Sequence, residues 1–236
     1  MKIVGNKKIN FVVVSYYTIN TIYEREIRRL LSSVQLFGLP YCIKSYPSFA
    51  NWYEGIQFKP VFLLKMLDKF PKTDLVYVDA DSKFLQFPTL FSQLADEKDV
   101  NMGVHLQDSS KELLTNTLFL KNNKIVRDIL TRWADSCSRC GSIWDTVSLK
   151  RALGKVSYCP LPEEYCVLDK NESKVNEPVI CHYQISQIQH IRENRPSYKR
   201  KKRNIKKLLN SGVSKKSGLR KVRQGGIWCN PKKNRF

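Results

Sequence analysis

Apolar and polar residues alternate along the first third of the chain in the pattern of strands and helices taken in turn. The run Ile9–Thr18, INFVVVSYYT, is largely apolar and β-branched, which is typical of a strand buried on both faces. Residues 21–38 instead carry apolar side chains at helical spacing and end at a glycine, and Pro60 begins a second helix in the turn where proline is tolerated. The pattern predicts strands over 9–18, 41–47 and 74–81 and helices over 21–38 and 58–71. This order predicts an α/β layer with a mainly parallel sheet.

The remainder of the chain up to residue 191 has shorter elements and one irregular segment. Its periodicity predicts helices over 87–96, 124–137 and 144–153 and strands over 101–106, 115–122 and 177–183. Residues 156–168, VSYCPLPEEYCVL, are predicted to be irregular. We find no internal repeat here.

A chain of 236 residues, 42% of them hydrophobic, can bury one sizeable core. It has no apolar run of the roughly 18 residues that a transmembrane helix requires. The N-terminus lacks the apolar segment and cleavage site of a signal peptide. Seven cysteines, an odd number at irregular spacing, are typical of reduced thiols. We therefore expect a cytoplasmic protein, in the host cytoplasm if a phage encodes it.

Positive charge is concentrated at the C-terminal end. The formal net charge is +20, and residues 192–236 contribute 17 Lys or Arg against one acidic residue. The preceding 191 residues hold 24 basic and 20 acidic side chains. We expect a globular domain over residues 1–191 and a basic C-terminal extension over 192–236 that meets an anionic partner. Two short helices around Gly212 would make the extension a minimal helix-turn-helix, and an arm that orders only on its partner is the alternative.

The strand predicted over residues 74–81 ends in two carboxylates one residue apart. Asp79 and Asp81 lie on the same side of an extended segment, because side chains alternate with a period of two. Ligands bind at such strand ends in parallel sheets, and two like charges there cost free energy unless a cation lies between them. Carboxylate oxygens suit Mg²⁺ or Mn²⁺, with phosphate oxygens completing the coordination. The alternative is that one aspartate caps the next turn and the other is solvated.

Several segments, taken in order, make the chain resemble the GT-A glycosyltransferases, the nucleotide-diphospho-sugar transferase superfamily. The resemblance covers roughly residues 9–189 and rests on FVVVSYYT, FKPVFLLKML, VYVDADSKFLQFP, NTLFLKNN, WDTVSLKRAL and VICHYQIS. It implies a Rossmann-like mixed, mainly parallel sheet flanked by helices, a UDP-sugar donor and a Mn²⁺ or Mg²⁺ cofactor. It also implies the metal ligands, which in this chain are Asp79, Asp81 and His182.

The same resemblance assigns further side chains to the donor. The implied contacts are Ser15, Tyr16 and Thr18 for the base and ribose, Lys59 for the diphosphate, Asp79 for the sugar nucleotide, and Asn116 and Thr117 for the transferred sugar. Simple packing is the alternative for Tyr16, and solvation is the alternative for Lys59.

An inverting transferase needs a carboxylate base within hydrogen-bond reach of the acceptor hydroxyl. Asp108 and Asp145 are the catalytic candidates, with Glu163 and Glu164 behind them. A cap in the first turn of a helix is the alternative for Asp145. A retaining enzyme can act without such a base, and the sequence leaves the stereochemistry open.

The basic extension leaves three functions open. The first is DNA modification by a glycosyltransferase of the kind that bacteriophages use on hydroxymethylated bases, because Lys and Arg suit a phosphate backbone. The second is a peripheral enzyme that builds lipopolysaccharide or another envelope glycan on an anionic membrane surface. The third is a nucleic-acid-binding module on an inactive transferase scaffold, which would tolerate loss of the metal residues that this chain retains. We expect DNA binding through the extension, ahead of the anionic membrane surface.

Overall fold

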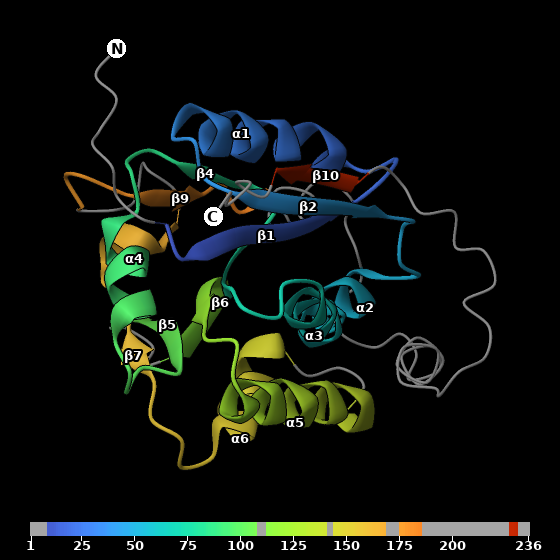
Figure 1. Ribbon diagram of the computed structural model, residues 1–236. Coiled ribbons are helices and arrows are strands. Elements are labelled where there is room, and N and C mark those ends of the chain that lie inside the picture. The colour runs from blue at the N-terminus through green and yellow to red at the C-terminus, as the bar shows by residue number, and fades with distance from the viewer. Residues whose placement is uncertain (1–8, 108–111, 141–143, 169–174, 186–226, 231–236) are drawn as a thin grey trace.

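The computed structural model describes residues 9–107, 112–140, 144–168, 175–185 and 227–230 (Figure 1). Asp108 and the two helices predicted for the basic extension lie outside these residues. The division into a domain over 1–191 and an extension over 192–236 therefore stays a prediction.

Strands and helices alternate through the first half of the chain, as predicted. The strands are β1 (Phe11–Thr18), β2 (Tyr41–Tyr46), β3 (Asp74–Val78), β4 (Ser82–Phe84), β5 (Met102–Gln107), β6 (Glu112–Leu120), β7 (Cys159–Pro160), β8 (Val167–Leu168), β9 (Ile180–His182) and β10 (Ile227–Asn230). The helices are α1 (Ile22–Leu36), α2 (Trp52–Gln57), α3 (Lys59–Lys69), α4 (Thr89–Asp96), α5 (Lys124–Cys140), α6 (Asp145–Leu153) and a 3₁₀-helix, Glu163–Tyr165.

A mixed seven-stranded sheet with strand order β10-β2-β1-β3-β6-β5-β7 forms the centre of the fold. β1 pairs in parallel with β2 and β3, whereas β6 runs antiparallel to both of its neighbours and β10 runs antiparallel to β2. Because β7 is parallel to β5, five of the seven strands point in the same direction. The prediction of a mainly parallel sheet flanked by helices is confirmed. A second sheet, in the order β4-β9-β8, packs beside it.

Helices cover both faces of the large sheet (Figure 1), and successive residues of β1 show how the core is divided. Val12 and Val14 pack with side chains of α3, α5 and α6. Phe11 and Val13 pack with α1 and α4 on the opposite face. None of the four is more than 1% exposed. Burial on both faces explains why the run Phe11–Val14 is apolar at every position.

Several short elements were not predicted. α2 begins after Asn51, which accepts a hydrogen bond from Glu54 N (3.0 Å) while its Nδ2 donates to Glu54 Oε1 (3.1 Å). This capping box is visible in the sequence as NWYE. The segment 156–168, predicted to be irregular, contains β7, the 3₁₀-helix and β8. These two-residue strands and the three-residue β4 form by pairing with distant strands, which local periodicity does not reveal.

Part of the basic extension belongs to the large sheet. β10 pairs with β2 so that Ile227 lies opposite Lys44 and Asn230 lies opposite Tyr41. Residues 227–230 therefore belong to the globular body, where β10 covers the edge of β2.

None of the helices in the described part of the chain is both long and apolar enough to cross a bilayer. The described cysteines form no disulfide, and most are buried: Cys42, Cys137, Cys166 and Cys181.

Candidate active site

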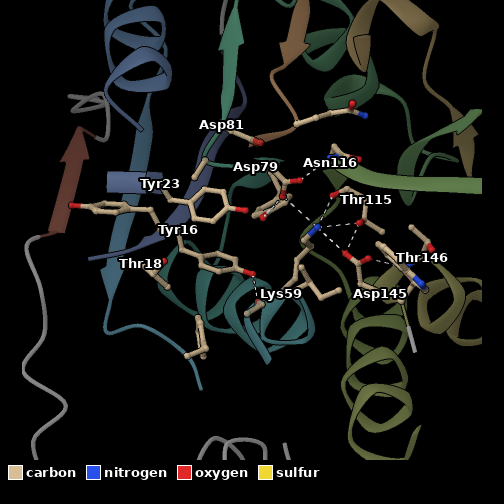
Figure 2. A pocket seen from close by; sticks show the side chains of 18 of the residues that line it. Tyr16, Thr18, Tyr23, Lys59, Asp79, Asp81, Thr115, Asn116, Asp145 and Thr146 are labelled. Atoms are coloured by element: carbon tan, nitrogen blue, oxygen red, sulfur yellow. Dashed lines mark hydrogen bonds and ion pairs between the residues drawn. The ribbon is translucent and has the colours of Figure 1, made fainter. Parts of the chain in front are cut away.

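A cleft of about 870 Å³ opens at the carboxyl ends of β1 and β3, which is where an open parallel sheet binds its ligands. The side chains that line this cleft come from elements far apart in the sequence (Figure 2). The wall of the cleft includes Tyr16 of β1, Lys59 of α3, Asp79 and Asp81 after β3, Asn116 of β6 and Asp145 of α6.

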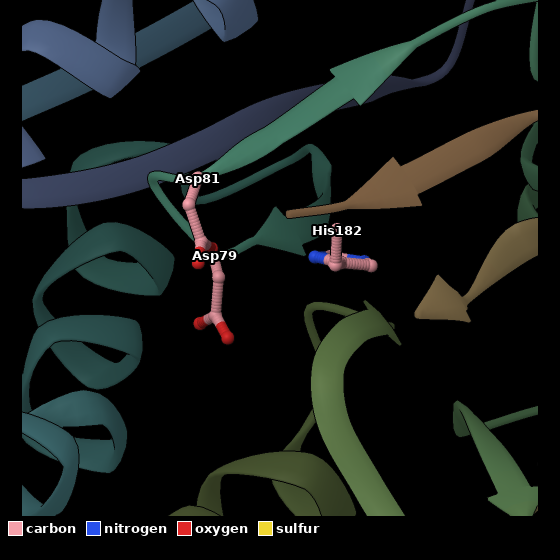
Figure 3. Close-up of side chains that lie close together, drawn as sticks. All are labelled: Asp79, Asp81 and His182. Carbon is pink, nitrogen blue, oxygen red and sulfur yellow. The ribbon is translucent and has the colours of Figure 1, made fainter. Parts of the chain in front are cut away.

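Pairing between strands places the two aspartates next to a histidine. β3 ends at Val78, and a tight turn follows in which Ser82 N donates to Asp79 O (3.2 Å). The chain then enters β4, which pairs with β9 so that Ser82 lies opposite His182. The short β4 is thus the reason that a histidine a hundred residues later in the chain lies beside the Asp-x-Asp motif (Figure 3).

Asp79, Asp81 and His182 could together hold a metal ion. Each offers one ligand atom, and the three atoms lie within 4.8 Å of one another. Asp81 Oδ2 accepts a hydrogen bond from Ile185 N (3.0 Å), which fixes this carboxylate. His182 is fully buried, and its Nε2 lies 2.8 Å from Thr117 Oγ1. Its Nδ1 is buried with no hydrogen-bond partner in the described residues.

These details fit a divalent cation. With the imidazole proton on Nε2 and donated to Thr117, the Nδ1 lone pair is left for a ligand, and such a second contact orients metal-binding histidines. Burial, with a contribution from Lys59, lowers the pKa of His182 to about 3, so the imidazole is neutral as a metal ligand must be. Burial and the neighbouring Asp79 raise the pKa of Asp81 to about 6, which shows that nearby positive charge falls short of what this carboxylate needs.

Lys59 is the internal cation of the site (Figure 2). Its Nζ lies 2.9 Å from Asp145 Oδ2 and 3.3 Å from Asp79 Oδ1. The same Nζ donates hydrogen bonds to the carbonyl oxygen of Thr115 (3.1 Å) and to its hydroxyl oxygen Oγ1 (3.0 Å). Thr115 Oγ1 in turn donates to Asp145 Oδ2 (2.6 Å). Burial alone would lower the pKa of Lys59, but Asp145 and Asp79 outweigh it and hold the pKa above its usual value. This lysine is therefore charged, and its ammonium group is already paired with Asp145 and Asp79.

The charges in the cleft do not balance. Four carboxylates line the described wall, namely the three aspartates Asp79, Asp81 and Asp145 in its inner part and the exposed Glu112. Lys59 is the one basic side chain among these described residues. When Lys59 and the three aspartates are ionised, two positive charges are missing in the inner part of the cleft, which is the charge of Mg²⁺ or Mn²⁺. Asp79 is further held by Tyr77 Oη (2.6 Å) and Asn116 Nδ2 (2.8 Å), so its carboxylate is fixed in place.

The structure brings most of the predicted site residues into one place. Seven of them line the cleft: Tyr16, Thr18, Lys59, Asp79, Asp81, Asn116 and Asp145. Ser15, Thr117 and His182 are completely buried, and Thr117 lies behind the wall as the partner of His182. Asp108 lies outside the described residues.

Some predicted residues have other contacts than expected. Tyr16 donates its hydroxyl to Gly55 O (2.7 Å), and its ring packs edge-on against Phe58 and Tyr46. Glu163 and Glu164 belong to the 3₁₀-helix and are not among the described residues that line the cleft.

Sequence reasoning missed two contributors to the site, Tyr77 and Thr115. Tyr77 is two residues before Asp79, and residues two apart in an extended segment lie on the same side, so the sequence would have placed Tyr77 beside Asp79. Thr115 directly precedes the predicted Asn116, but its contact with a lysine 56 residues earlier leaves no local signal.

No family model and no curated protein sequence matches this chain. Solved structures do resemble it. A glycosyltransferase involved in the glycosylation of the major capsid of PBCV-1 is 16% identical, with a TM-score of 0.59 over 78% of this chain and 98% of that chain. The glycosyltransferase GlyE of Streptococcus pneumoniae TIGR4 is 15% identical, with a TM-score of 0.56 over 75% of this chain and 55% of that chain. Mouse xyloside xylosyltransferase 1 is 10% identical, with a TM-score of 0.50 over 75% and 99%.

At these identities the likeness concerns the fold. The chain has the GT-A fold, which confirms the fold class that the sequence motifs implied.

Replacing Asp81 by Asn should weaken Mn²⁺ binding at least about tenfold, because it removes a charged ligand of the proposed cation. Isothermal titration calorimetry would measure this, and Mn²⁺ should raise the melting temperature of the wild-type chain more than that of the variant. Without metal the variant should be no less stable than the wild type, since the raised pKa shows that burial disfavours this carboxylate. Asp135→Asn, at an exposed position on α5, is the control. Equal Mn²⁺ affinity in D81N and the wild type would contradict the metal site.

Replacing Lys59 by Met should destabilise the fold by about 3–5 kcal/mol, because it leaves the buried Asp145 and the partly buried Asp79 without their cation. Adding Asp145→Asn to this variant should restore part of the loss, since one of the uncompensated charges is removed as well. Urea unfolding of the wild type, both single variants and the double variant would give the coupling free energy. Additive effects would show that the ion pair between Lys59 and Asp145 does not hold the site together.

Proposed function

We propose that the chain is a metal-dependent glycosyltransferase that moves a sugar from a UDP-sugar to a hydroxyl acceptor. One observation carries the proposal: Asp79 and Asp81 line a cleft at the carboxyl edge of a GT-A sheet, with the buried His182 beside them. The inner part of this cleft lacks two positive charges. A nucleoside diphosphate brings further negative charge, so it would bind here together with a divalent cation. The similar solved structures named above are glycosyltransferases, which supports the same reaction.

The metal site would serve the leaving group. Asp79, Asp81 and the Nδ1 of His182 would hold Mn²⁺ or Mg²⁺, which when bound supplies positive charge to the departing diphosphate. In the transfer, the acceptor oxygen forms a bond to the anomeric carbon while the bond from that carbon to the diphosphate oxygen breaks. The electron pair of that bond leaves with the diphosphate, and the acceptor proton must pass to a base or to solvent.

Asp145 is our candidate for the group that faces the reacting sugar. Its Oδ2 is held by Lys59 and Thr115, and its Oδ1 accepts a hydrogen bond from Thr146 N (3.0 Å). These contacts fix the carboxylate at the start of α6, on the wall of the cleft. It would serve either as the base for the acceptor hydroxyl or as a contact to the sugar. Asp108 remains the second candidate from the sequence.

The donor would run along the cleft from the metal centre. We propose that the base and ribose lie toward the end of β1, where Tyr16 and Thr18 line the wall and Ser15 lies buried beneath. Asn116 would contact the transferred sugar, with Thr117 behind it. We assign Lys59 to the compensation of Asp79 and Asp145 rather than to direct contact with the diphosphate, because its ammonium already has four oxygen atoms within 3.3 Å.

Two acceptors follow from the basic extension. The sequence favours a hydroxymethylated base in DNA, supported by the charge of residues 192–236 and by a possible helix-turn-helix. The same charge would hold the protein on an anionic membrane surface, where the acceptor is an envelope glycan. A cytoplasmic location is compatible with both proposals. The exposed Trp144 and Val147 and the acidic Glu112 in the wall of the cleft favour the glycan.

Radiolabelled UDP-glucose with Mn²⁺ and no acceptor should be hydrolysed slowly to UDP and glucose, and the rate should fall to background without Mn²⁺. We expect Asp145→Asn to lower the turnover rate by at least about 100-fold, the size of effect of a positioned base or electrostatic group. Asp135→Asn should behave as the wild type. No UDP release from UDP-glucose, UDP-galactose or GDP-mannose would contradict the proposed activity.

Replacing Lys199, Arg200, Lys201, Lys202 and Arg203 by Ser tests the extension while keeping β10 in the sheet, which truncation would not. If these side chains bind phosphates, the slope of log affinity for duplex DNA against log salt should fall by up to about 4–5, because each contact contributes about 0.9. Fluorescence anisotropy at several salt concentrations would measure it. Lys98→Ser with Lys124→Ser, two exposed positions of the body, is the control. An unchanged slope would show that DNA is not bound through this cluster.

A further inference from the structure

The cleft extends to both sides of Asp79 and Asp81 (Figure 2). One end, near the carboxyl end of β1, is lined by hydroxyl-bearing side chains that include Thr18, Thr21 and Tyr23. The other end lies between β6 and the start of α6. Its described lining residues are Gln107, Glu112, Leu114, Trp144, Thr146 and Val147. If the donor base occupies the first end, the second end is the one left for the acceptor.

This second end presents an exposed apolar surface. Trp144 is 48% exposed and Val147 is 40% exposed, although side chains of this size are normally buried. The other exposed large hydrophobic residues in the described chain, Leu36 and Ile125, do not line the cleft. Apolar surface that remains exposed within a polar cleft is typical of a binding site.

Trp144 is held in place by its surroundings. Its carbonyl oxygen accepts a hydrogen bond from Ser148 N (3.1 Å) in the first turn of α6, and the next residue is Asp145. The ring of Tyr53 meets its indole edge-to-face, with centroids 6.3 Å apart and planes at 75°. The indole is therefore fixed by α2 and α6 next to the carboxylate proposed to face the reacting sugar.

The charges of the described residues at this end disfavour a phosphate-bearing group. Glu112 and Asp145 are acidic, and no basic residue is found among the described residues that line this end. Lys59, deeper in the cleft, is committed to Asp79 and Asp145. A phosphate group here would add negative charge to a cleft whose described wall has four carboxylates and one lysine, whereas sugar hydroxyls can donate hydrogen bonds to carboxylates.

We infer that Trp144 and Val147 form the acceptor subsite, and that the acceptor unit is a neutral pyranose ring of a glycan. The apolar face of C–H groups on such a ring matches an indole face, and its hydroxyls match Glu112, Gln107 and Asp145. This inference rests on the proposed function and specifies its acceptor. A flipped DNA base would also stack on an indole, but its flanking phosphates would meet the acidic side chains.

The experiment compares two classes of acceptor with labelled UDP-sugars and Mn²⁺. The first class is a panel of methyl glycosides of glucose, galactose, mannose and N-acetylglucosamine, and the second is duplex DNA that contains hydroxymethylcytosine. We expect label to enter at least one glycoside and none to enter the DNA. Label in the DNA, or UDP release without transfer to any glycoside, would overturn the inference while leaving the transferase intact. No UDP release would instead show that the proposed function itself is wrong.

Variants then test the named residues. Trp144→Ala should raise the KM for the glycoside about tenfold or more, with a much smaller change in the KM for the UDP-sugar, and Trp144→Phe should recover part of the loss because it restores an aromatic face. Ile125→Ala, an exposed hydrophobic position on α5, should leave both constants at wild-type values. Equal changes in both KM values in W144A, or none, would show that the indole is not an acceptor platform.

Discussion

Three aspartates share one ammonium group in the inner part of the cleft, and this shortage of positive charge is the constraint on which the site depends. Lys59 compensates Asp79 and Asp145 by direct contact, whereas Asp81 accepts a backbone hydrogen bond from Ile185 and forms no ion pair with another described residue. Carboxylates this close to one another in a cleft repel strongly once water is removed. The free energy that holds them together therefore comes from elsewhere, namely from the core on both faces of the sheet. Without a bound cation, the repulsion between the three aspartates destabilises the site. A divalent cation would bring the net charge of these aspartates and Lys59 to zero.

The sequence revealed the parts of the site that a single strand carries. Asp79 and Asp81 could be predicted as neighbours at a strand end because the strand period and the rule for parallel sheets suffice. His182 could be placed only through the resemblance to a family, since its position depends on the pairing of β4 with β9. The network around Lys59 could not be predicted at all. Its partners lie 56 and 86 residues away, and no local pattern links a lysine before a proline to Asp145.

The same division holds for the fold. The strands and helices of the first half could be predicted, because each carries its own periodicity and stop signals. α2 was missed despite a visible capping box, so a local signal was present and overlooked. β4, β7 and β8 have two or three residues and no signal of their own. β10 was hidden by its surroundings, because the charge around it is typical of an exposed segment.

The position of β10 has a consequence for association between molecules. Edge strands expose unpaired N–H and C=O groups, and other chains can pair with them. At one edge of the sheet, β7 is only two residues long and contains Pro160, which lacks an N–H donor. At the other edge, β10 covers β2, whose sequence YCIKSY is longer and largely apolar. Proteolytic loss of β10 would turn β2 into an exposed edge, so the C-terminal end of the chain also protects the protein against edge-to-edge aggregation.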